Sequence, residues 1–505
     1  MHKSIAKRIR YPSYQSERFK RLDILDRMLK GEFYDHLGVD FYTETEGPDG
    51  SGKYIPIAER RPSVQTGFAS QVANSTSRKL FAGRHVPRIT HDNRAYRDWL
   101  LKLASRSSLF ERMLKAARIG SVGSVAITFR LISGSLVLDV WRPKYCEPSF
   151  SPTGDLVKLR VQYISRGAEL RAVGFTTDDR GSELDSDDDY WFVREFTSNE
   201  EITYLPQEAD EAPGVAHDLV ESKRIAHNLG FVPGVWIQNL PGDDATDGIS
   251  TFGAAMSNIV EMDYTLSQMG RGIRYNAAPQ LVIVGKMVNN TDSINRGPVT
   301  IIHLESAYSN DDQKYGAADA KLLEMVGNGV RAGIEYIALL RKLSFELIAA
   351  SYKTPETHKG TVSGRAMEIL DDSFYDLVYT LRTSYGDSGL VKLLSKIAQA
   401  CMLTGVMPYK DLGVTEKTAT EFGLSWPKMY NATPTDETQI IEGMLMATQG
   451  NLVDEDTASR YISSQLDLED YRVETPPQTE GAVESDAPVP KEDTPKKIEQ
   501  DKQLV

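Results

Sequence analysis

One glycine-rich segment of the sequence is close to a phosphate-binding motif. Residues 47–53 run Gly-Pro-Asp-Gly-Ser-Gly-Lys, which matches the first seven positions of a P-loop, whose backbone N–H groups cradle nucleotide phosphates. The eighth position, where a Ser or Thr hydroxyl would hold Mg²⁺, is Tyr54. The flanking residues also lack the pattern of a buried strand before the loop and a helix after it, which aim a helix N-terminus at the phosphates. We therefore interpret the segment as an exposed loop.

No other pattern in the sequence predicts catalysis or metal binding. The eight histidines form no HxH or HExxH spacing, and no GxSxG nucleophile elbow is present. Cys146 and Cys401 lie far apart, which excludes a disulfide framework and a cysteine-based zinc site. The acidic residues at 185 and 187–189 lack the Gly and the distal Glu of an EF-hand, so they predict a solvated loop. We expect no catalytic residue, no metal and no cofactor.

The length of the chain indicates its number of domains, and its charge excludes some classes of DNA-binding protein. A chain of 505 residues suits two to four domains. Its formal net charge of −13 argues against a repressor, nuclease or histone-like protein, because tight binding of duplex DNA usually needs a basic excess. The charge is compatible with a protein that lets DNA pass. No run of about 18 apolar residues predicts a membrane span, and the basic N-terminus lacks the apolar run of a signal peptide.

Hydrophobic periodicity predicts an α+β fold. Helices are expected within 1–45 and over 63–81 and 92–119. The composition then becomes β-branched and glycine-rich, which predicts a hairpin around Ser133 and Gly134 and further strands up to residue 238. Helices followed by a mostly antiparallel sheet are typical of an α+β domain.

The second half of the sequence is predominantly helical. Two long amphipathic helices, 252–275 and 326–351, flank a small α/β segment. A loop at 352–363 precedes a third helix, from Gly364 to about residue 404, which the cluster Gly386-Asp-Ser-Gly389 should bend or interrupt. Two short helices follow, and Asp454 suits the N-cap of the second. The acidic, proline-rich segment after residue 475 should be disordered.

Four segments occur in an order that resembles the portal (head-to-tail connector) protein of tailed bacteriophages. Their sequences are HNLGFVPGVWIQN (227–239), GISTFGAAMSNIVEMDYTLSQMGRGIRYNAAPQLVI (248–283), IALLRKLSFELIAASYKTPETHKGTVSGRAMEIL (337–370) and SWPKMYNATPTDETQIIEGMLMATQGNLVDEDTASRYI (425–462). They resemble, in turn, the last wing strand, the first stem helix entering the clip, the second stem helix with the tunnel loop, and the Trp-Pro strand with the crown helices. The resemblance spans about residues 60–465 and rests on the order of elements more than on identity.

The resemblance implies a portal-like α+β fold with an α/β wing, a long-helix stem, a small α/β clip and a helical crown. The implied domains, in chain order, are the wing 1–250, stem helix 251–278, clip 279–325, stem helix 326–351, tunnel loop 352–363, long wing helix and closing strand 364–435, crown 436–470, and a disordered acidic tail 471–505.

The resemblance also implies a function without catalysis. Portal proteins form a ring, typically of twelve subunits, at one capsid vertex of the virion, after assembly in the host cytoplasm. Double-stranded DNA enters and leaves through the channel without sequence recognition. The implied partners are other copies of the chain, the major capsid protein, the scaffolding protein, the head-tail adaptor and the terminase large subunit, and no membrane. Because ATP hydrolysis belongs to the terminase, the incomplete P-loop agrees with this function.

Particular residues acquire roles through the resemblance. The tunnel loop would face DNA with Lys353, His358 and Lys359, and Arg365 follows it; the alternative is an ordinary polar loop. Channel lining and subunit contact are both open for Arg271, Arg274 and Lys286. A ring needs large complementary surfaces, which the long helices would supply. The residues expected to pack them are Met256, Met262, Leu266, Met269, Ile334 and Leu340.

Two other functions remain open at this stage. One is an enzyme whose carboxylate or metal site is gathered from distant positions. Magnesium-dependent ATP turnover that is lost on Lys53→Ala would favour it. The other is a different phage structural protein, such as an adaptor or coat protein. The number of copies per virion separates these, since a coat protein is present in hundreds and a connector in about a dozen.

Overall fold

The computed structural model divides the chain into two compact units, Met1–Asn431 and Ala432–Val505. Each unit is described by itself. The described residues are 2–12, 15–46, 52–209, 218–244, 246–277, 280–284, 286–287, 304–305, 308–309, 314–315, 319–323, 328–348, 372–406, 414–415, 417–427, 429, 434–450 and 452–465.

A three-stranded antiparallel sheet lies at the centre of the first unit. Its order is β12-β4-β5, built from β4 (Ser124–Ile132), β5 (Ser135–Trp141) and β12 (Gly234–Gln238). The β4–β5 turn consists of Ser133 and Gly134, with φ of 50° and 77°. Positive φ at both positions is the type I′ geometry whose twist matches that of a hairpin. The hairpin predicted around these two residues is confirmed.

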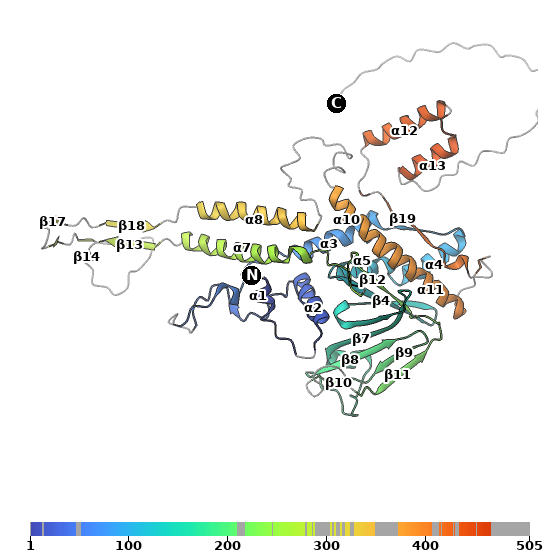
Figure 1. Ribbon diagram of the computed structural model, residues 1–505, viewed down its shortest axis with the longest axis horizontal. Coiled ribbons are helices and arrows are strands. Elements are labelled where there is room, and N and C mark those ends of the chain that lie inside the picture. The colour runs from blue at the N-terminus through green and yellow to red at the C-terminus, as the bar shows by residue number, and fades with distance from the viewer. Residues whose placement is uncertain are drawn as a thin grey trace, which may run out of the picture. The chain divides into compact units, whose positions relative to one another are not determined.

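A larger antiparallel sheet follows in the sequence (Figure 1). Its order is β11-β9-β8-β7-β6, and β10 pairs with β8. Its strands are β6 (Cys146–Phe150), β7 (Leu156–Arg166), β8 (Asp189–Phe196), β9 (Glu200–Tyr204), β10 (Gln207–Glu208) and β11 (Glu221–Ala226), with the short helix α6 (Gly167–Val173) after β7. Together the two sheets and the helices confirm an α+β fold.

Helices from both ends of the first unit complete its main core. The N-terminal ones are α1 (His2–Ala6), α2 (Glu17–Lys30), α3 (Phe68–Phe81), α4 (Arg94–Arg106) and α5 (Leu109–Gly120), with short strands β1 (Val39–Asp40), β2 (Arg60–Arg61) and β3 (Arg88–Thr90) between them. Residues 31–45, expected within a helical region, form turns and β1 instead. Gly31, with φ of 81°, ends α2 in the left-handed conformation that glycine adopts without strain. The strand β19 (Gly423–Ser425) returns to pair with β3.

The third long helix is continuous where the sequence predicted a bend or a break. It consists of α10 (Asp372–Arg382), a π-helical stretch Thr383–Val391, and α11 (Lys392–Leu403). A Cβ atom at Gly386 would lie 2.8 Å from the ring of Trp426, and one at Gly389 would lie 2.7 Å from Ile237. The glycines therefore allow the wider helix to pack closely on its neighbours, and they do not interrupt it.

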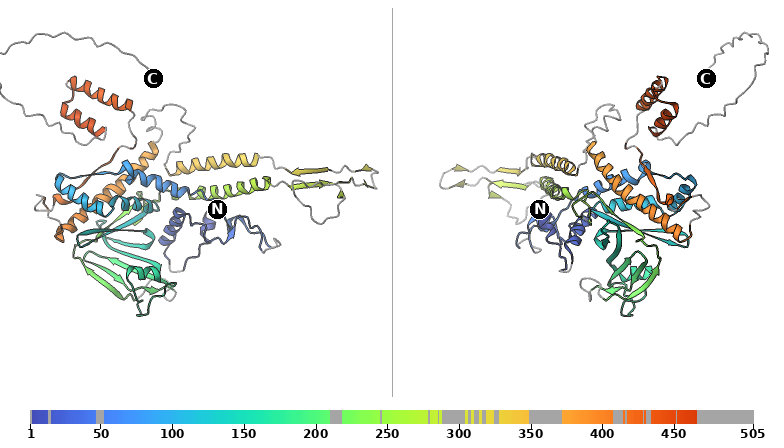
Figure 2. Two further views of the ribbon diagram at one scale, coloured as in Figure 1. Left: turned by 180° about the vertical axis from the view of Figure 1, so that it is seen from behind. Right: turned by 45° about the vertical axis from the view of Figure 1, so that its right-hand side comes forward.

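Two long helices, α7 (Met256–Ala277) and α8 (Asn328–Leu347), lie side by side, as the two views of Figure 2 show. They confirm the helices predicted within 252–275 and 326–351. Between them in the sequence, β13 (Gln280–Val284) pairs with β18 (Asp319–Leu323), β14 (Lys286–Met287) with β15 (Leu304–Glu305), and β16 (Tyr308–Ser309) with β17 (Lys314–Tyr315).

The second unit contains two short helices, α12 (Pro434–Gln449) and α13 (Glu455–Gln465). Asp454 caps the second helix, because its Oδ2 accepts a hydrogen bond from the Thr457 N–H at 3.2 Å. The predicted cap is therefore confirmed. Residues 466–505, which include the tail predicted to be disordered, lie outside the described residues. In the parts of both units that the structure describes, no helix has the length and apolar character needed to cross a bilayer.

We predict that Gly120→Ala destabilises the first unit by about 1–3 kcal/mol, the usual cost of overpacking a core. Tyr385 is fully buried, and its hydroxyl donates to Asn239 Oδ1 at 3.1 Å. A Cβ at Gly120 would lie 2.1 Å from that hydroxyl. Chemical denaturation would measure the change in the free energy of unfolding.

The matched control is Gly272→Ala in α7, where a new Cβ meets no atom within 4 Å. It should leave stability unchanged or raise it by up to about 1 kcal/mol, because alanine is the better helix former. Tyr385→Phe should restore part of the stability lost in the Gly120→Ala variant. An unfolding midpoint of Gly120→Ala equal to that of the wild type would contradict the packing described.

Candidate functional site

The pair α7 and α8 is antiparallel. The C-terminal part of α8 contacts the 3₁₀ turn Gly253–Ala255 that leads into α7, and Gly333, near the start of α8, lies against Met269, near the end of α7. At a rise of 1.5 Å per residue, the 22 residues of α7 and the 20 of α8 measure about 33 and 30 Å. Helices of this length present large side surfaces.

One face of each helix is buried within the chain's own core. Along α8, Leu340, Ser344 and Ile348 follow at intervals of four residues and are at most 7% exposed. The Ser344 hydroxyl donates to the Leu340 carbonyl at 2.7 Å, so this polar side chain is satisfied inside the helix. From α7, Met256 and Met262 join the same hydrophobic cluster as residues of α2 and α3.

A buried carboxylate joins α7 to the N-terminal part of the chain. Asp263 is 2% exposed and accepts three hydrogen bonds, from the Thr66 N–H at 2.7 Å, the Thr66 hydroxyl at 2.8 Å and the Tyr34 hydroxyl at 2.9 Å. Burial raises the pKa of Asp263, and these donors partly oppose the shift. One turn further along α7, the Ser267 hydroxyl accepts from the Val64 N–H at 3.1 Å. The first half of α7 is therefore fixed in place.

A second row of apolar side chains on α8 is exposed. Tyr336, Leu339, Leu343 and Leu347 are spaced by three or four residues, which places them on one face of the helix. Each is between 40% and 54% exposed. We call these four residues the α8 stripe. Contiguous exposed apolar surface is unusual on a monomer, so α8 has one face in the core and a second apolar face that the described residues leave exposed.

The ring-packing residues predicted from the sequence differ in how far they are buried. Met256, Met262 and Leu340 are buried in the chain's own core, so they are not available to a second subunit. Leu266 and Met269 are half-buried. Ile334 is 57% exposed but lies on a different side of α8 from the stripe. Periodicity identified the apolar positions of α8 and could not say which of its two rows would be covered, and so the sequence did not single out the stripe.

The predicted channel or contact residues have partners within the chain where the structure describes them. Arg271 forms an ion pair with Glu44, and the Arg274 guanidinium lies 4.4 Å from the centre of the Tyr42 ring. Both interactions join α7 to the segment between β1 and β2. Lys286 lies in β14, in register with Glu305. A role of these three residues in lining a channel stays a prediction.

Residues 349–371, which include the whole predicted tunnel loop, lie outside the described residues. The predicted DNA-facing residues Lys353, His358, Lys359 and Arg365 belong to this segment. Residues 47–51 of the P-loop-like segment also lie outside the described residues. After Lys53, the chain forms the 3₁₀ turn Ile57–Glu59 and the strand β2 before the next α-helix begins at Phe68, whereas a P-loop leads directly into a helix.

The described residues contain no group of three or more His, Cys, Asp or Glu side chains arranged to hold a metal ion. Cys146 and Cys401 are buried free thiols, and burial raises the pKa of each. A thiol that stays protonated is a poor nucleophile and a poor metal ligand.

No family model and no curated protein match this chain. Among solved structures, it is similar to a chain of the structure titled "Neck of empty GTA particle computed with C6 symmetry". The identity is 11%, the TM-score is 0.39, and the alignment covers 79% of this chain and 89% of that one. At these values the similarity determines neither the fold nor the function of this chain.

We predict that Leu340→Asp, but not Leu343→Asp three residues further along the same helix, destabilises the fold. Leu340→Asp should lower the free energy of unfolding by at least about 2–5 kcal/mol, the cost of emptying a buried leucine site, because it also buries an unpaired carboxylate. Leu343→Asp should stay within about 0.5 kcal/mol of the wild type, as is usual for exposed positions. Thermal and chemical unfolding of the unassembled chain measure both, and equal losses would contradict the two faces assigned to α8.

Proposed function

We propose that this chain is a portal protein, which assembles into a ring at one capsid vertex of a tailed phage and forms the channel for packaging and ejection of DNA. The observation that carries the proposal is the α8 stripe on a long antiparallel helix pair. Exposed apolar residues along a helix of about 30 Å favour contact with another helical surface of similar length. A second copy of the chain offers such a surface in α7 and α8.

A ring follows from the kind of contact that the stripe makes. A stripe that contacts a different surface of the next copy is a heterologous interface, and such interfaces close into rings when the rotation allows. The order of elements supports the same proposal, since a helix-and-sheet region, two long helices flanking short strands, a third long helix and two short helices follow each other as in the portal family.

The charge of the chain suits a conduit. A net charge of −13 per copy gives a ring that does not hold the DNA phosphates tightly. The tunnel loop at 352–363 would supply the few cations that touch the DNA backbone. In this proposal the protein is not an enzyme. It belongs to the virion, its partners are the capsid, scaffolding, adaptor and terminase large-subunit proteins, and the terminase supplies the ATP hydrolysis.

The stripe gives a direct test of assembly. About twelve copies of a 56.3 kDa chain would give a particle of about 0.7 MDa with a central hole, which native mass spectrometry and negative-stain imaging would detect. We expect the double variant Leu339→Asp, Leu343→Asp to fold and to remain unassembled, because its carboxylates would be desolvated at the interface.

The matched control is Ala338→Asp, which adds the same charge at an exposed position on another side of α8. It should still form rings. Wild-type chains that stay monomeric in the presence of the other capsid components would count against the portal function itself. Rings formed equally well by the double variant would count against the stripe alone.

Passage of DNA can be tested separately from assembly. Deleting residues 352–363 should leave ring mass unchanged and impair DNA packaging or retention, since it removes the cations nearest to the proposed channel. Replacing Lys353 and Lys359 by Gln should cause a smaller loss, with Lys115→Gln in α5 as the control. Packaging at the wild-type level in the deletion variant would remove the role assigned to this loop.

A further inference from the structure

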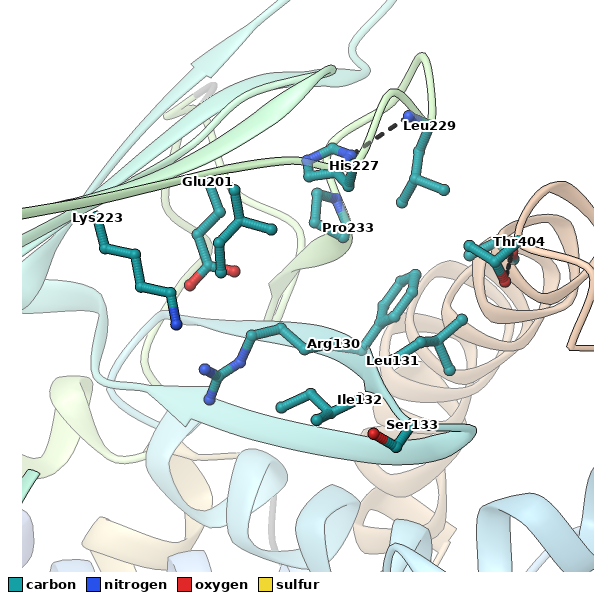
Figure 3. Close-up of a pocket in the computed structure, with 13 residues that line it drawn as sticks. Arg130, Leu131, Ile132, Ser133, Glu201, Lys223, His227, Leu229, Pro233 and Thr404 are labelled. Carbon is teal, nitrogen blue, oxygen red and sulfur yellow. Dashed lines mark hydrogen bonds between the residues drawn. The ribbon is translucent and has the colours of Figure 1, made fainter.

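A cleft of about 430 Å³ lies between the two sheets of the first unit (Figure 3). Its floor is the end of β4 and the Ser133 turn, and its roof is formed by β9 and β11. Ala400 of α11 and Thr404, the C-cap of that helix, close one end. The volume is that of a ligand site, which typically combines apolar walls with a few placed polar groups.

The charged side chains around this cleft carry one positive charge in excess. Arg130 of β4 pairs with Asp139 of β5 at 2.8 Å. Glu201 of β9 also lines the cleft, and its carboxylate lies 3.6 Å from Arg194 of β8.

The unmatched charge belongs to Lys223 of β11. Its ammonium group has no ion-pair partner within 4 Å in the parts of the chain that the structure describes. Figure 3 shows this ammonium group and the Arg130 guanidinium directed into the same space. Arg130 Nε is buried and makes no hydrogen bond to a described residue. A carboxylate placed between Arg130 and Lys223 would neutralise the excess and satisfy an orphaned donor.

Most of the other residues that line the cleft are apolar, and Ser133, His227 and Thr404 are the polar ones among them. Ile132 lines the floor, and Leu229 and Pro233 line the side opposite to the charges. His227 Nδ1 accepts a hydrogen bond from the Leu229 N–H at 3.3 Å, which holds this wall in place (Figure 3). Burial lowers the pKa of His227, so its ring is neutral at pH 7 and adds no charge. The occupant therefore needs apolar groups beside its carboxylate.

The cleft opens along an edge strand. β11 is the first strand in the order of the larger sheet, and all six of its residues are exposed. Within the described residues, no strand pairs with its outer edge. Lys223 and Ile225 are two residues apart, so both side chains point to the cleft side of the sheet, while Arg224 on the other side pairs with Glu200 and Glu221. An extended backbone could continue the sheet here, as in strand-addition complexes.

We propose that this cleft binds an extended acidic peptide segment of a partner protein, added as a strand along β11. A Glu or Asp side chain of the segment would lie between Lys223 and Arg130, and its apolar neighbours on the same face would contact Ile132 and Leu229. This inference does not depend on the ring, because every group that it uses belongs to one copy of the chain.

The test uses a labelled synthetic probe and the full-length protein. The probe is the capped peptide Thr-Val-Thr-Glu-Thr-Val-Thr, in which the Glu and both Val side chains lie on one face of the strand, and its control carries Gln in place of the Glu. Fluorescence anisotropy should show at least about tenfold weaker binding of the Gln peptide, because charge-assisted hydrogen bonds are roughly twice as strong as neutral ones. Lys223→Glu should abolish binding, and Lys223→Ala should weaken it at least about tenfold. Lys115→Ala, an exposed lysine on α5, should bind as the wild type does.

Three outcomes would overturn the proposal. Equal binding of the Glu and Gln peptides, or unchanged binding by Lys223→Ala, would remove the carboxylate contact. Two peptides, N-methylated on the odd-numbered or on the even-numbered amides, test for pairing with β11. If both bind as the unmethylated peptide does, and isovalerate competes fully with it, the cleft would be assigned to small amphipathic acids instead. Binding to single chains but not to assembled rings would show that a neighbouring copy fills the cleft. The circular-dichroism spectrum and unfolding midpoint of each variant, matched to the wild type, establish that the losses are local.

Discussion

One buried carboxylate fixes α7 to the N-terminal part of the chain. Asp263 lies inside the core, where an ionised group without partners would cost several kcal/mol. It is stable there because Thr66 and Tyr34 donate three hydrogen bonds to it. These donors come from segments about 200 residues earlier in the chain. The interaction therefore holds the N-terminal region against α7, on which α8 packs.

Once α7 is held, α8 has more apolar surface than the described residues bury. The row containing Leu340 faces the core, and the row containing Leu343 does not. A helix that is apolar on two sides is either buried or shared with a partner. The same reasoning explains why only some of the residues predicted to pack a ring are exposed enough to contact another chain. Met256 and Met262 stabilise the chain itself, whereas an interface has to use side chains that folding leaves exposed.

Local features were predictable from the sequence, and long-range pairings were not. The turn at Ser133 and Gly134 and the cap at Asp454 depend on neighbouring residues, so turn and capping rules suffice for them. The contacts of Arg271 with Glu44 and of Arg274 with Tyr42 join residues far apart in the chain, and no spacing encodes them. Gly386 and Gly389 predicted a break because glycine weakens helices, but close packing on Trp426 and Ile237 outweighs that preference. Likewise, the candidate residues Lys223 and Arg130 carry no motif and meet only through the packing of two sheets.

The charge of the whole chain and the charge of its cleft act on different length scales. At physiological ionic strength, charges separated by more than about 8 Å are largely screened in solvent. The net −13 therefore governs how the surface as a whole responds to DNA, while Lys223 and Arg130 govern what enters the space between them. An acidic protein with a locally cationic, partly apolar cleft repels polyanions in general and still accepts a single carboxylate on an apolar segment. That combination favours a short acidic protein segment over nucleic acid at this surface.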